Sequence, residues 1–95
     1  MAQRIRIECI NKTDRMNAYE RIKSIGGRNA DGSIWRLPLE DAIIGVEIQK
    51  YDFFVIVDGY AVKVVISKSA YGHKYLKTLA DGEMPNNLLS LPECT

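Results

Sequence analysis

Residues 51–67 read YDFFVIVDGYAVKVVIS, and this stretch decides the fold that the sequence predicts. Two runs of β-branched and aromatic residues flank Asp58-Gly59, and an Asp-Gly pair in this setting favours a two-residue type I′ turn. Such a turn pairs Val57 with Tyr60 and makes an antiparallel hairpin. One face of the hairpin is then wholly apolar and the other is mixed, so the mixed face also needs a cover.

Length and composition predict one domain over residues 1–95, because 95 residues with 46% hydrophobic side chains suit a single small core. No apolar run is long enough to span a bilayer, and residues 1–10 lack the apolar segment of a secretory signal. We therefore expect a cytoplasmic protein without a membrane partner. In that compartment Cys9 and Cys94 are expected to be reduced thiols.

Four further elements are expected before the hairpin: a strand over residues 3–10, a helix over 18–25, a strand over 33–37 and a helix over 38–50. Strict alternation predicts the first strand, and Gly26-Gly27 is typical of a helix end that leads into a polar loop. Pro38 suits the first turn of the second helix, whose apolar stripe fits the apolar hairpin face. The order predicts an α+β fold, a small mixed sheet with helices on one face.

Residues 70–95 predict an irregular tail that wraps over a core of about residues 3–67. Its leucines are costly to leave in water, so we expect it to cover the mixed hairpin face around Phe54 and Ile56. A loop anchored in this way could bind a partner, or its polar residues could only shape turns. The candidate tail binding surface comprises His73, Lys74, Lys77, Thr78, Asp81, Asn86 and Asn87.

Charge is unevenly placed along the chain. Residues 1–36 hold eight Lys or Arg and four Asp or Glu, which gives +4, and the remainder holds five against eight, which gives −3. This asymmetry favours either a basic face or two complementary halves that pack together. Four side chains are candidates for a nucleic-acid face on the polar side of the sheet: Arg4, Arg6, Phe54 and Lys63. Single-strand binders combine cations and stacking aromatics in this way.

The tail also resembles a family of small bacterial proteins known as a domain of unknown function. The resemblance rests on a pattern of Tyr-Leu-Lys-Thr, then Asp, then Asn-Asn-Leu-Leu-x-Leu-Pro-x-Cys, with the runs SIGG, SIWRL and LEDAI upstream. The matching residues are Tyr75, Leu76, Lys77, Thr78, Asp81, Asn86, Asn87, Leu88, Leu89, Leu91, Pro92 and Cys94. This resemblance implies a bacterial or phage origin and a cytosolic setting, and it implies no activity or catalytic residue.

The sequence favours no catalytic or metal chemistry. Cys9, His73 and Cys94 lack the close spacing of zinc ligands, and no local pattern pairs a cysteine nucleophile with the histidine. We therefore expect no cofactor and a non-enzymatic binding or regulatory module that contacts a protein or a small ligand. The alternative is a nucleic-acid-binding accessory protein that uses the polar sheet face. A homodimer through the hairpin edge or through an uncovered mixed face is compatible with either function.

Overall fold

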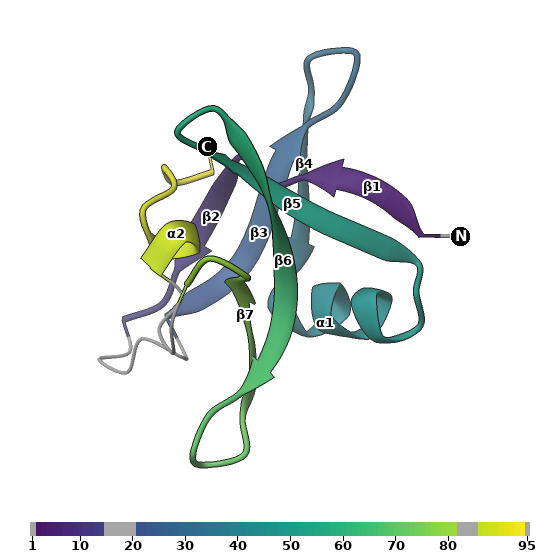
Figure 1. The fold of residues 1–95 in the computed structure, drawn as a ribbon. Coiled ribbons are helices and arrows are strands. Elements are labelled where there is room, and N and C mark those ends of the chain that lie inside the picture. The colour runs from purple at the N-terminus through teal and green to yellow at the C-terminus, as the bar shows by residue number, and fades with distance from the viewer. Residues whose placement is uncertain (1, 15–20, 82–85, 95) are drawn as a thin grey trace.

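The structure is a computed structural model that describes residues 2–14, 21–81 and 86–94. It is a small mixed α/β fold dominated by strands (Figure 1). Its elements in chain order are β1 (Gln3–Arg6), β2 (Cys9–Lys12), β3 (Ile22–Arg28), β4 (Ile34–Pro38), α1 (Leu39–Glu47), β5 (Tyr51–Val57), β6 (Tyr60–Lys68), β7 (Lys74–Thr78) and α2 (Asn86–Leu89).

The strands form two sheets, one in the order β1-β5-β6-β7 and the other in the order β2-β3-β4. β1 runs parallel to β5, and all other neighbouring strands are antiparallel. The predicted first strand is interrupted between β1 and β2, where the chain passes from one sheet to the other. Ile7 N still donates to Phe54 O, whereas Glu8 N donates to Gly26 O, each at 2.9 Å. Residues 7 and 8 therefore hold the two sheets together.

The predicted hairpin is confirmed in β5 and β6. Val57 pairs with Tyr60, and Asp58 and Gly59 have the positive φ values, 51° and 84°, that the tight turn requires. On the apolar face, Phe53, Val55 and Val64 are each 1% exposed. The mixed face keeps Ile56 37% exposed, so the expected cover by the tail is not confirmed.

The second predicted helix is confirmed as α1, which follows Pro38 and packs against strands of both sheets. Ala42 and Ile43 join the core cluster that contains the hairpin residues, as the apolar stripe predicted. Figure 1 shows α1 lying across one end of the molecule, beside the ends of β4 and β5. Gly45 is buried against Tyr51, and a Cβ at this position would overlap the tyrosine ring.

The helix predicted over residues 18–25 is wrong where it can be compared, because residues 22–25 lie in β3. Residues 18–20 lie outside the described residues. Gly26 and Gly27 do not end a helix but form the middle of this strand, without positive φ. A Cβ at Gly26 would lie 2.7 Å from Trp35 O and 2.9 Å from Cys9 Sγ. The two glycines are used for close approach, which is a known role of glycine in strands.

The prediction of two reduced thiols is also wrong, because Cys9 and Cys94 form a disulfide with a Cα–Cα separation of 5.0 Å. Hydrogen bonds align the C-terminal segment with β2: Ile10 N donates to Pro92 O, and Cys94 N donates to Ile10 O. The two cysteines are 85 positions apart, so no local pattern indicated the pair.

The tail is not irregular, because β7 pairs with β6 and extends the four-stranded sheet. Leu76 and Leu88 are both 0% exposed and belong to the same core cluster as Phe53. The tail therefore contributes a strand and core side chains. α1 packs on strands of both sheets, whereas α2 packs on β7.

Candidate functional site

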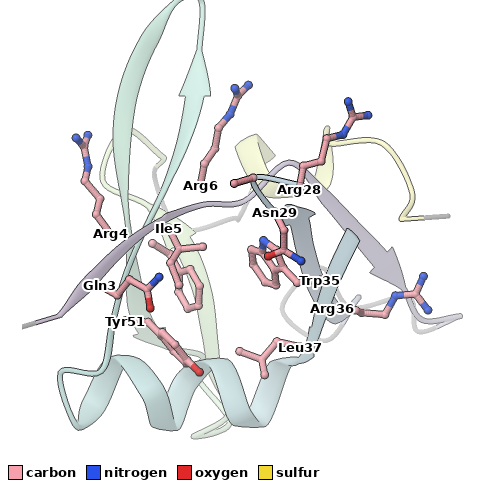
Figure 2. A pocket seen from close by; sticks show the side chains of 12 residues that line it. Gln3, Arg4, Ile5, Arg6, Arg28, Asn29, Trp35, Arg36, Leu37 and Tyr51 are labelled. Carbon is pink, nitrogen blue, oxygen red and sulfur yellow. The ribbon is translucent and has the colours of Figure 1, made fainter. Parts of the chain in front are cut away.

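A groove of about 450 Å³ opens between β1 and β4, the edge strands of the two sheets. We call it the β1–β4 groove. Ile5 and Tyr51 face Trp35 and Leu37 across it, and α1 lies at its lower end (Figure 2). The strand alternation of β1 and β4 turns these apolar side chains toward the space between the sheets.

Aromatic rings form the floor of this groove. The rings of Trp35 and Phe53 stack at 6.2 Å between centroids with an interplanar angle of 19°. Tyr51 tilts against Phe53 at 5.3 Å and 36°. Phe53 is 1% exposed, whereas Trp35 and Tyr51 are half-buried and line the open space. The floor therefore offers fixed aromatic surface to a ligand.

Arginines surround the aromatic floor, and they come from β1, β3 and β4. Arg6 and Arg28 extend their guanidinium groups to the same side of the groove, while Arg4 and Arg36 point outward at its flanks (Figure 2). All four side chains are exposed. No Asp or Glu is among the described residues that line the groove. Guanidinium stays charged and suits planar anions, so the exposed arginines give the rim of the groove a chemistry that is compatible with an anionic ligand.

Hydrogen bonds hold the part of the rim that β3 supplies. Arg28 N donates to Glu8 Oε2 at 2.8 Å, which ties the end of β3 to the link between β1 and β2. In the following loop, Ser33 N and Ser33 Oγ both donate to Asp31 Oδ1, at 2.9 and 2.6 Å. These hydrogen bonds lower the pKa of Asp31 below its ordinary value of 3.8. The loop beside the groove is thus fixed by its own polar groups.

The four residues predicted for a nucleic-acid face lie together on the outer side of the four-stranded sheet. The guanidinium carbon of Arg4 lies 4.4 Å from the centroid of the Phe54 ring. Phe54 pairs with Lys63 on β6 and with Arg6 on β1. Arg4, Phe54 and Lys63 also line a shallow depression of about 170 Å³, which we call the outer hollow.

The predicted tail residues are not gathered in one place. Asp81 accepts hydrogen bonds from the backbone N and Oγ1 of Thr78 and from Asn87 N, and Asn87 Nδ2 donates to Thr78 Oγ1 at 2.8 Å. This network joins β7 to α2. At the other end of β7, Lys74 forms an ion pair with Glu47 of α1.

Three further predicted tail residues complete this description. His73 lies in the loop before β7, where its backbone N donates to Ser69 Oγ. Lys77 is half-buried in β7, and the side chain of Asn86 lies outside the described part of the chain. Of the predicted tail residues, Thr78, Asp81 and Asn87 are therefore joined by hydrogen bonds to one another.

Of the residues that line the β1–β4 groove, the predicted site residues include only Arg4 and Arg6. Those that they omit include Arg28, Trp35, Arg36 and Tyr51. The excess of basic residues within residues 1–36 was a signal for Arg28 and Arg36, since it includes all four arginines of the rim, but it does not indicate Trp35 or Tyr51. The pairing of β3 with β4 was needed to place them around one space.

The described residues were compared with the requirements of a metal site and of a membrane-spanning helix. In residues 2–14, 21–81 and 86–94, no group of three or more His, Cys, Asp or Glu is placed to hold a metal ion. Among the helices of these same residues, none has the length and apolar character needed to cross a membrane.

Comparison of the sequence with protein-family models finds a match to one family. A family model described as "Protein of unknown function (DUF3892)" matches residues 6–92, which is nearly the whole chain. The comparisons with curated proteins and with solved structures gave no match.

Proposed function

The chain belongs to the DUF3892 family, whose description states no function, and we propose that it is a non-enzymatic binding module for single-stranded nucleic acid. One observation carries this proposal: four arginines surround an aromatic-floored groove whose described lining contains no carboxylate. This is the combination by which single-strand binders hold a backbone and its bases.

The arginines supply the electrostatic part of binding. Arg6 and Arg28 reach the same side of the groove, and guanidinium groups bind phosphate through two parallel hydrogen bonds (Figure 2). Because phosphate contacts release counterions from the nucleic acid, binding should weaken steadily as salt rises. The small net charge of +1 is no obstacle, because four arginines line this groove and no Asp or Glu is among its described lining residues.

The aromatic floor favours a single strand over a duplex. Bases in a duplex stack on one another, whereas an unpaired base can leave its neighbours and lie on Trp35 or Tyr51. The groove volume of about 450 Å³ falls within the range of pockets that hold small ligands, so one base with its sugar is a plausible occupant. Stacking would give little sequence preference, because every base has an aromatic face.

The tail surface is less well supported as the contact. Three of its members, Thr78, Asp81 and Asn87, already satisfy one another by hydrogen bonds. Their arrangement supports the turn-shaping role that the sequence left open. We therefore place the binding role on the β1–β4 groove.

We also propose a bacterial cytosolic setting, as the sequence resemblance implied. Disulfides are rarely maintained in the cytosol, so the Cys9–Cys94 disulfide of this structure would persist there only if it resists reduction by the cytosolic thiols. Neither cysteine lines the β1–β4 groove. Nucleic-acid binding should therefore occur with or without the disulfide.

The test is fluorescence anisotropy of a labelled oligothymidylate of about eight nucleotides, titrated between roughly 50 and 200 mM salt. The parent protein should bind, and Arg6→Ala with Arg28→Ala should weaken binding and reduce the salt slope by about 1.4. Lys68→Ala is the matched control, because Lys68 is exposed at the far end of β6. If the parent protein does not bind at low salt, or if the control weakens binding as much as the arginine pair, the proposal is wrong.

A further inference from the structure

The outer hollow lies beside the β1–β4 groove, on the other side of β1. Arg4 lines both depressions, and so does Phe53 from below. Adjacent strands of a sheet lie only about 4.8 Å apart, so a ligand in the groove needs to cross just one strand to reach the hollow. The two depressions are therefore close enough for one extended ligand to occupy both.

The hollow repeats the chemistry of the groove on a smaller scale. Phe54 is half-buried, and the Arg4 guanidinium lies over its ring at 4.4 Å. Lys63 is the cross-strand partner of Phe54, and Arg6 is its partner on β1. One aromatic side chain thus stands among three cations, all of which are exposed.

One carboxylate sets a boundary to this surface. Asp52 is half-buried, lines the hollow and pairs with Arg4 across β1 and β5. A phosphate that approaches this end would be repelled, whereas one that approaches Lys63 and Arg6 would not. The charges therefore favour a path over the Phe54 and Lys63 part of the hollow.

We propose that a single strand bound in the β1–β4 groove continues past the Arg4 guanidinium on its Phe54 side, away from Asp52, into the outer hollow. There a second base displaces this guanidinium from the Phe54 ring, and Lys63 binds a phosphate. This inference rests on the proposed function and extends the proposed binding site from the β1–β4 groove into the outer hollow. Arg4 is the shared contact, since its planar group faces Phe54 and its position borders the groove. The footprint is then at least two nucleotides, one base in the groove and one in the hollow.

The test compares oligothymidylates of about two and about eight nucleotides by competition against a labelled strand. We expect the longer strand to bind more tightly. Phe54→Ala should weaken the longer strand about fivefold or more and leave the shorter strand unchanged. Lys63→Ala should lower the salt slope for the longer strand by about 0.7. Asp52→Asn should strengthen binding of the longer strand, because it removes the repulsion.

The outcomes separate this inference from the proposed function. If both strands bind, but length gives no gain and Lys63→Ala has no effect, the extension into the hollow is wrong and the groove stands. If neither strand binds at low salt, the proposed function itself fails, and the extension fails with it. Lys63→Ala keeps the test decisive even if Phe54→Ala does not fold, because Lys63 is exposed.

Discussion

The ring of Trp35, from the three-stranded sheet, stacks on the ring of Phe53, from the four-stranded sheet, at 6.2 Å and 19°. This contact joins the two sheets and also forms the floor of the β1–β4 groove. Gly27, the partner of Trp35 on β3, leaves room for the indole: a Cβ there would lie 2.9 Å from Trp35 Nε1. Packing of the core and shape of the candidate site therefore depend on the same side chains.

Gly45→Ala should destabilise the protein although alanine is the better helix former. The helix interior would gain about 1 kcal/mol from the change. The added Cβ would overlap the ring of Tyr51, and overpacking of this kind costs about 1 to 3 kcal/mol. Urea denaturation measures the difference, and Ile44→Ala, at a position 53% exposed in the same helix, should change stability little. A Gly45→Ala protein more stable than the parent would contradict this packing.

Removal of the disulfide should lower stability while binding is retained. The link between Cys9 and Cys94 closes a loop of 85 positions, for which loop entropy gives about 4.6 kcal/mol. The double variant Cys9→Ser with Cys94→Ser should melt roughly 10 °C or more below the oxidised parent. Reductant should reproduce this shift in the parent and leave the double variant unaffected. Equal melting of the oxidised parent and the variant would show that the pair does not stabilise the fold.

Thr78→Val should destabilise the protein without affecting nucleic-acid binding. Thr78 is 0% exposed, and its hydroxyl donates to Asp81 and accepts from Asn87. Loss of the hydroxyl leaves part-buried polar groups without a partner, which costs about 1 to 3 kcal/mol. Ser90→Ala removes an exposed hydrogen bond and should stay within about 0.5 kcal/mol of the parent. If Thr78→Val abolished binding in a folded protein, the tail surface would replace the groove as the site.

The loop that follows β3 should depend on pH through Asp31. The folded-state pKa of Asp31 lies below 3.8 because Ser33 donates two hydrogen bonds to its carboxylate. A lowered pKa means that this contribution is present above about 3.8 and is lost as pH falls through the folded value. In an NMR titration, the Ser33 amide signal should therefore move with a midpoint below 3.8, and Asp31→Asn should abolish the movement. A midpoint above 3.8 would contradict these hydrogen bonds.

Local patterns were sufficient to predict the hairpin and α1. The turn at Asp58-Gly59 and the alternation on both sides of it fix a register that needs no information from the rest of the chain. In α1, the apolar stripe likewise acts within one element, and Pro38 directly precedes the helix as its N-cap.

Long-range contacts decided what the sequence could not predict. Gly26-Gly27 suits a helix end or a crowded strand equally well, and the crowding comes from Cys9, Trp35 and Cys94, which are distant in sequence. The β1–β4 groove had the same difficulty, because its arginines come from strands of two sheets. By contrast, hairpin register places Phe54 and Lys63 on one face, and strand alternation places Arg4 and Arg6 on one face of β1. That the two faces coincide depends on the long-range pairing of β1 with β5, which local patterns only allowed.

The emission of Trp35, the single tryptophan of the chain, tests the central claim most directly. An unlabelled oligothymidylate should quench Trp35 fluorescence to saturation at low salt, because a base stacks in the groove that this indole lines. The quenching should weaken as salt rises and should be reduced by Arg6→Ala with Arg28→Ala. Unchanged Trp35 emission, at strand concentrations where anisotropy reports binding, would place the strand elsewhere and contradict the account.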